Sequence, residues 1–90
     1  MPASFAEDHL IQKVNPEYPQ MARMAHIQGA VVLQCIIDKA GNVTQPHAVS
    51  GHPILIQAAL DAVKKWKYRP FLLNGSPVAV KINITMTFHM

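Results

Sequence analysis

The sequence predicts an α+β fold: a three-stranded antiparallel sheet in the order 2-1-3, with two helices packed on one face. Three observations carry this prediction. Apolar and polar residues alternate strictly near the C-terminal end, an apolar run ends in a Gly-Asn turn, and a longer stretch has apolar residues at helical spacing. Half of the 90 residues are hydrophobic, which suffices for the core of one small domain. We expect residues 1–14 to form a loose N-terminal arm and residues 15–90 to form the domain.

The first regular element is expected to be a short helix that follows two prolines. The segment "NPEYP" holds the chain extended or in turns. Pro19 can occupy the first turn of a helix because its missing N–H is not needed there. The following "QMARMAHIQG" is typical of a short helix stopped by Gly29. The methionines expected to fill the core are Met21, Met24, Met86 and Met90.

Two strands are predicted next, joined as a hairpin. The run "AVVLQCIID" is apolar on both faces, which is typical of a central strand. In "DKAGNV" the Gly41-Asn42 pair supplies positive φ, so residues 43–50 fold back as the second strand. Pro46 cannot donate to a ladder, which makes this second strand an edge. Val32 and Ile36 then lie on the face away from the helices, either as scattered surface apolarity or as a dimer or partner face.

The stretch "SGHPILIQAALDAVKKWKY" predicts the long helix. Ser50 or His52 leads into it, and Pro53 suits its first turn. Its apolar stripe consists of Leu55, Ala58, Ala59, Ala62 and Trp66. Arg69-Pro70 is expected to stop the helix, and "NGSP" to turn the chain into the last strand.

The last strand is predicted over residues 78–90, where the alternation does not slip. One face carries Val78, Val80, Ile82, Ile84, Met86, Phe88 and Met90, and the other carries Ala79, Lys81, Asn83, Thr85, Thr87 and His89. This strand would pair with strand one and form the second edge of the sheet. Natural edges are blunted by charge, proline or bulges. Lys81 is the only such residue here, so the edge is expected to be open.

Other functional classes find little support in the sequence. Aromatic residues lie beside Lys64, Lys65, Lys67 and Arg69, but such a cluster in a last helical turn complements the helix dipole, and the net charge of +3 is too mild to indicate nucleic-acid binding. His47 and His52 lack further ligands at zinc-site spacing. Cys35 alternates with apolar neighbours and is expected to be an inert buried thiol. We expect no metal, no cofactor and no enzymatic activity.

The segments "NPEYP", "GAVVLQCIIDKAGNV", "WKYRP" and "NGSPV", followed by the alternating last strand, resemble the TonB C-terminal domain family over residues 14–90. The family fold, three antiparallel strands with two helices on one face, agrees with the order argued above. The resemblance also implies a periplasmic domain of an inner-membrane-anchored protein, driven by inner-membrane proton-driven motor proteins through an N-terminal anchor and proline-rich linker. We therefore expect the chain to be a fragment of such a protein, with a stand-alone adaptor as the alternative.

The resemblance further implies a partner for the open edge. The domain would bind the TonB box of TonB-dependent outer-membrane transporters by β-strand addition and so couple proton-motive force to active import, including siderophore uptake. The implied partner-binding residues are Asn15, Pro16, Tyr18, Val80, Lys81, Ile82, Asn83, Ile84, Thr85, Met86 and Thr87. The alternative is a cell-envelope structural domain that self-associates through the same edge, for example as a homodimer. A nucleic-acid binder would need groove-reading motifs that the sequence lacks.

Overall fold

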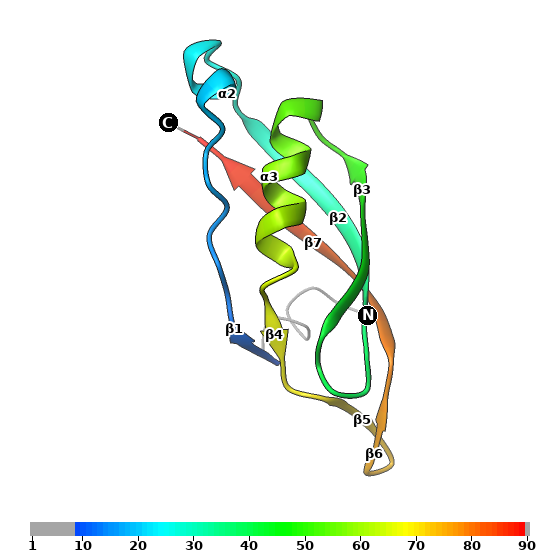
Figure 1. Ribbon diagram of the computed structural model, residues 1–90. Coiled ribbons are helices and arrows are strands. Elements are labelled where there is room, and N and C mark those ends of the chain that lie inside the picture. Colours follow the sequence, from blue (N-terminus) through cyan, green and yellow to red (C-terminus); the bar gives the residue numbers. More distant parts are fainter. Residues whose placement is uncertain (1–8, 90) are drawn as a thin grey trace.

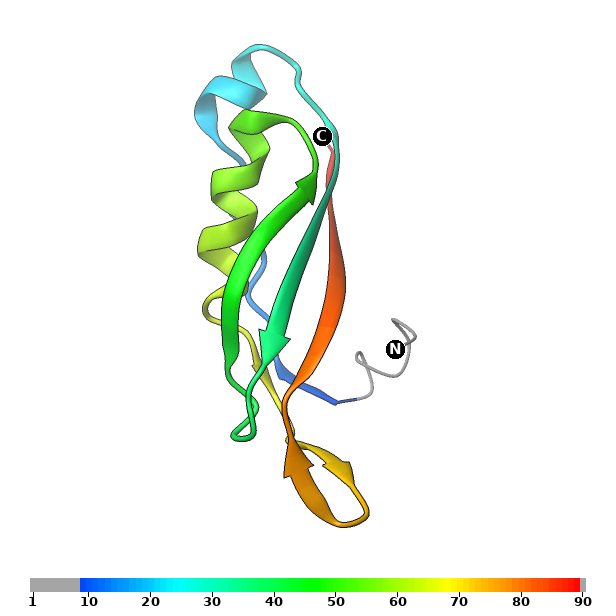
Figure 2. The ribbon, with the colours of Figure 1, turned by 90° about the vertical axis from the view of Figure 1, so that its right-hand side faces the viewer.

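A twisted sheet of three antiparallel strands, in the order β3-β2-β7, forms one layer of the molecule (Figure 1). The computed structural model describes residues 9–89. The strands are β2 (Gly29–Ile37), β3 (Val43–Ser50) and β7 (Val80–Phe88). The helices α2 (Gln20–Met24) and α3 (Pro53–Val63) lie on the same side of the sheet (Figure 2). The predicted fold class and strand order are confirmed.

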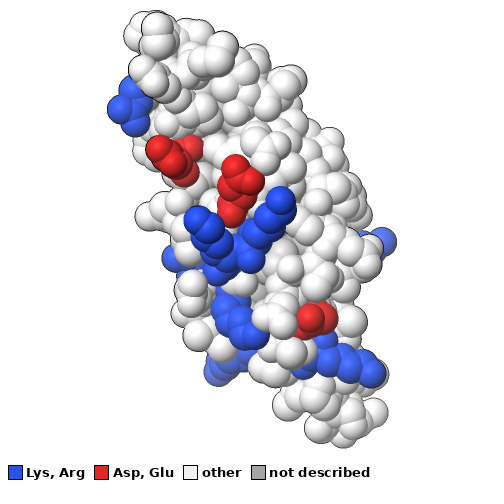
Figure 3. All heavy atoms as spheres, viewed as in Figure 1, with Lys and Arg blue, Asp and Glu red and all other residues white. Residues whose placement is uncertain are grey.

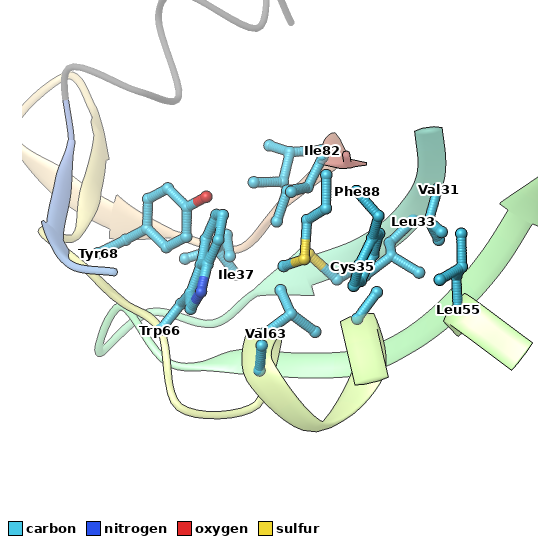
Figure 4. Packing of buried hydrophobic residues seen from close by; sticks show 14 of the residues in the cluster. Val31, Leu33, Cys35, Ile37, Leu55, Val63, Trp66, Tyr68, Ile82 and Phe88 are labelled. Atoms are coloured by element: carbon cyan, nitrogen blue, oxygen red, sulfur yellow. The ribbon is translucent and has the colours of Figure 1, made fainter. Parts of the chain in front are cut away.

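The hydrophobic core lies between the sheet and α3 (Figure 4). Alternate residues of a strand face the same side, and one set from β2 and one set from β7 are buried here. The buried strand residues are Val31, Leu33, Cys35 and Ile37 of β2, and Ile82, Ile84, Met86 and Phe88 of β7. The helix contributes Leu55, Ala59, Ala62 and Val63. Its two buried alanines let the backbone of α3 lie close to the sheet.

Two smaller sheets were not predicted from the sequence. The strand β1 (Leu10–Gln12) pairs with β4 (Lys67–Tyr68), and β5 (Phe71–Leu73) pairs with β6 (Ser76–Val78). Part of the arm expected to be loose is therefore a strand, because β4 offers it a partner far along the chain. Positions 1–8 lie outside the described residues, and the domain boundary after residue 14 stays a prediction.

Both helices end earlier than predicted. The backbone of His26 has φ of 57°, so the chain leaves α2 before Gly29, which instead begins β2. The helix α3 ends at Val63, because the chain beyond it pairs with β1. Trp66 lies past the helix end, and its indole N–H donates to the C=O of Val14 at 2.8 Å. These long-range contacts override the local helical pattern.

The structure also tests what was expected of the helix caps, the lysine cluster and the methionines. His52 is the N-cap of α3 and accepts a hydrogen bond from the N–H of Ile54, as one of the two predicted candidates. The last turn of α3 has no basic residue, because Lys64 is already its C-cap. The lysine cluster therefore lies at and beyond the helix end instead of in the last turn, and its helix-dipole role stays a prediction. Met86 is buried as predicted, but Met21 and Met24 are 71% and 74% exposed.

The edge strand β3 is irregular. Thr44 pairs with Ile36 and His47 pairs with Gln34, so two residues of β3 oppose Cys35. One of them is Pro46, which a bulge can accommodate because the bulged residues leave the ladder. A second register shift follows nearer Ser50. The predicted edge position of this strand is confirmed.

The last strand is shorter than predicted. The alternating burial holds from Val80 to Phe88, but Ala79 interrupts the strand, and Val78 belongs to β6, where it pairs with Phe71. Residue 90 lies outside the described residues. The predicted strand over 78–90 is therefore two strands that serve different sheets.

Two glycines in turns allow a prediction on stability. Gly41 has φ of +89°, and a Cβ there would lie 1.9 Å from the backbone oxygen of Tyr68. Gly75 has a similar φ of +81° but nothing within 4 Å. We expect Gly75→Ala to lower the free energy of unfolding by about 1 kcal/mol, from backbone strain alone. Gly41→Ala should lower it by about 3 kcal/mol or more, because backbone atoms must also move. Urea denaturation measures both, and equal losses would contradict this account of the turn.

Candidate functional site

The outer edge of β7 is regular and has no partner strand within the described part of the chain. Its pairing with β2 runs from Gly29↔Phe88 to Ile37↔Val80 without a register shift. The opposite edge of the same sheet, β3, carries a proline and two register shifts. Bulges and prolines prevent further strand addition, so the sheet is protected on one side and open on the other.

The direction of the main-chain groups of β7 follows from the hydrogen bonds of β2. The hydroxyl of Thr44 donates to the C=O of Ile36 at 2.8 Å, so the main chain of Ile36 faces β3. In a strand the N–H and C=O of one residue point to the same side, and this side alternates along the chain. The odd-numbered residues of β2 therefore face β7 and bond to the even-numbered residues of β7 that oppose them. The residues whose main chain points to the open edge are Lys81, Asn83, Thr85 and Thr87.

The structure thus divides the predicted binding residues of β7 into two sets. The four with outward main-chain groups also have exposed side chains on the face away from the helices. Ile82, Ile84 and Met86 are buried in the core, and their main chains are used in pairing with β2. These three residues anchor the edge strand in the core, and their buried side chains are not accessible to a partner. Val80, at the start of the strand, is partly buried.

The other predicted binding residues lie in the extended segment before α2, which runs along the helix side of the sheet toward the end of β7 (Figure 1). Tyr18 fixes this segment twice. Its hydroxyl donates to the C=O of Ile27, and its ring meets that of Phe88 edge-on at 5.7 Å. Pro16 is half-buried and Asn15 is exposed. Tyr18 therefore joins this segment to the end of β7.

A groove of about 430 Å³ lies between this segment and α3. Val14 and Ala58 contribute apolar walls, and Asn15 lies on its border. Glu17, Asp61 and Lys65 place charges of both signs around it. Sequence reasoning missed this groove, because its two sides are about forty residues apart and only the tertiary fold brings them together.

The face of the sheet away from the helices is mostly polar. Gln34 donates from Nε2 to Oδ1 of Asn83 at 3.2 Å across β2 and β7. Val32 and Ile36 are half-buried on this face, and their use as a dimer or partner face stays a prediction.

Metal and thiol chemistry find no site in residues 9–89. No group of three His, Cys, Asp or Glu side chains is placed there to hold a metal ion. Cys35 is buried, and burial raises the pKa of its thiol from 9.0 to about 11. A thiol that ionises so late is a poor nucleophile near neutral pH. In the same part of the chain, no helix is long and apolar enough to cross a membrane.

By its fold and its open edge, this domain belongs to the class of small α+β domains whose sheet has one protected and one unpaired edge. The family model described as the C-terminal of the Gram-negative bacterial TonB protein matches residues 14–90. The chain belongs to this TonB C-terminal family. The predicted resemblance is confirmed, and the family is one of non-enzymatic proteins, which agrees with the sequence-based expectation.

Individual relatives support the same assignment. The chain is 39% identical to the protein TonB of Vibrio cholerae over 80 residues, which cover 87% of this chain and 33% of that protein. It is 36% identical to the protein TonB of Xanthomonas campestris, over 81% of this chain and 34% of that protein. The chain thus spans about a third of the length of these relatives. The solution structure of the Pseudomonas aeruginosa TonB C-terminal domain has the same fold, with a TM-score of 0.75, 23% identity, and coverage of 90% of this chain and 84% of that one.

The buried thiol predicts how stability depends on pH. Cys35 ionises near pH 9 when unfolded and near pH 11 when folded. Its contribution to stability is therefore complete below pH 9 and is lost as the pH rises toward 11. We expect a loss of about 2 kcal/mol relative to Cys35→Ala, which lacks this titration. Urea denaturation of both proteins across this range measures the difference. A constant gap between them would show that the thiol titrates normally.

Proposed function

We propose that this domain captures the TonB box of TonB-dependent outer-membrane transporters as an added strand beside β7. The observation that carries the proposal is the regular, unpartnered edge of β7 in a chain of the TonB C-terminal family. Main-chain pairing recognises an extended peptide largely independently of its side chains. One domain could therefore serve several transporters with different sequences.

The number of outward groups sets a limit on affinity. Four residues of β7 direct their N–H and C=O groups outward, and a short peptide would form about 4–6 hydrogen bonds with them. Each contributes a net ~0.5–1.5 kcal/mol, whereas association costs ~4 kcal/mol or more. The strand alone would bind weakly, so contacts beside it are needed.

The segment before α2 is placed to supply these contacts. Residues that oppose each other in an antiparallel ladder project to the same face. Peptide residues opposite Ile84 and Met86 would therefore point to the helix side of the sheet. On that side they would meet the segment that carries Asn15, Pro16 and Tyr18, and the ring of Tyr18 contacts Phe88 at the end of β7. Side-chain preference would thus be read at alternate peptide positions.

The wider role that we propose is the one that the family resemblance implies. The domain would work in the periplasm as part of an inner-membrane-anchored protein, pulled by proton-driven motor proteins so that transporters import cargo such as siderophores. The alternative uses the same groups: a second copy of β7 could pair antiparallel with the first and make a structural homodimer. Both versions depend on the outward main chain of β7.

Proline substitution tests this dependence. Thr85→Pro and Asn83→Pro each remove an N–H that points to the open edge, without removing a bond to β2. We expect each variant to keep its fold and to bind a TonB-box peptide at least about tenfold more weakly. Thr85→Ala is the matched control, because it removes the side chain and keeps the N–H. NMR titration of the labelled domain measures both affinity and position.

The outcomes separate the two versions. Shifts along Lys81–Thr87 and Asn15–Tyr18 on adding peptide, lost in the proline variants, would support capture at this edge. Unchanged affinity in both proline variants would refute strand addition. If the free domain sediments as a dimer that both prolines dissociate, and no peptide binds, the homodimer version replaces transporter capture.

A further inference from the structure

The hairpin β5–β6 is a second exposed feature, and it projects beyond the sheet at the end opposite α2 (Figure 2). The 11 residues from Pro70 to Val80 carry no charge, whereas Arg69 precedes them and Lys81 follows them. Two large apolar side chains lie on the hairpin, Leu72 and Leu73, which are 62% and 63% exposed. Isolated surface leucines are ordinary, but two adjacent ones on a projecting, charge-free hairpin form an apolar tip.

The hairpin is firmly held at its base. Phe71 is 2% exposed, and its ring stacks on that of His9 with a centroid distance of 4.3 Å. At the tip, Asn74 and Gly75 have φ of 52° and 81°, the conformation of a tight two-residue hairpin turn. The strands pair in register from Phe71↔Val78 to Leu73↔Ser76. The exposed leucines therefore lie on a paired hairpin with a tight turn and a buried base.

Basic residues gather around this base. The turn that carries Lys39 is held against β4, because the N–H of Tyr68 donates to the C=O of Gly41 at 2.9 Å. Lys67 of β4 donates from Nζ to Oδ1 of Asn42, at 2.5 Å. Figure 3 shows basic side chains over the half of this face nearer the hairpin, and an uncharged tip beyond them. Asp38 lies in the same turn and offsets part of this charge.

We propose that this end of the domain docks on an anionic phospholipid surface, with Leu72 and Leu73 entering the headgroup–acyl boundary and with Lys39, Lys67, Arg69 and Lys81 near the headgroups. The arrangement of the leucines favours lipid over a protein pocket. Adjacent residues of a strand project to opposite faces, so both leucines are buried only by a partner that surrounds the tip. A lipid layer does so, and apolar insertion combined with basic charge is how peripheral proteins bind anionic bilayers.

This proposal goes beyond peptide capture and can be tested separately. The 90-residue chain would be sedimented with vesicles of phosphatidylcholine containing 30% phosphatidylglycerol, and with pure phosphatidylcholine as the neutral reference. We expect binding to the anionic vesicles only, reduced by added salt. Leu72→Ser with Leu73→Ser should lower the partition coefficient at least about tenfold, since both insertions are lost. NMR signals of Leu72–Ser76 should broaden with vesicles.

The matched control is Met21→Ser with Met24→Ser, which removes two apolar side chains that are at least as exposed, at the other end of the molecule. It should change the partition coefficient less than about twofold. Absence of binding to anionic vesicles, or equal binding by the leucine variant, would overturn the proposal. In the first case a protein partner for the hairpin replaces lipid. The leucine variant should still bind a TonB-box peptide, so failure of lipid docking is distinguishable from failure of strand addition.

Discussion

The antiparallel pairing of β2 with β7 is the constraint on which the rest of the structure depends. Nine residue pairs follow one another without a register shift, and both strands bury alternate residues on the same side. A slip of one residue would turn the whole apolar set of β7 toward solvent. The core therefore fixes the register, and the register in turn fixes which main-chain groups of β7 point outward. The geometry of the open edge is a consequence of core packing rather than of any residue at the edge itself.

The two edges of the sheet differ in how readily another strand could join them. In β3 the proline and the extra bulged residues break the row of main-chain groups that another chain could join. In β7 the row is intact, and Lys81 is its only charged residue. An edge that is left regular while its counterpart is disrupted offers a single place for strand addition.

The elements that the sequence predicted are those in which local pattern and tertiary packing agree. The alternation in β7, the turn at Gly41 and the edge character conferred by Pro46 all depend on neighbours in sequence. Of the predicted Gly41-Asn42 pair, only Gly41 has a positive φ. The failures concern residues whose partners lie far along the chain. The sequence pattern places Trp66 on the apolar stripe of the predicted helix and Tyr68 near its end. The bond of the indole to Val14 and the pairing of β4 with β1 draw both residues out of the helix. Likewise, the pattern placed Val78 in the last strand, whereas the turn at Gly75 pairs it with Phe71. The groove beside Asn15 has no sequence signal, because it exists only between packed segments.

The interruption of the strand at Ala79 separates the two proposed sites. The outward main-chain groups of β7 begin at Lys81, whereas the hairpin ladder ends at Val78, so the groups with which an added strand would pair end before the apolar tip. Lys81 is the one residue common to both sites, and it contributes through different parts. Its main chain is part of the open edge of β7, and its exposed side chain is one of the basic groups near the foot of the hairpin. A change that neutralises this side chain would alter the electrostatics of the proposed lipid docking and would leave every main-chain bond available. The proposed peptide capture and the proposed membrane docking would thus be separable even at the residue that they share.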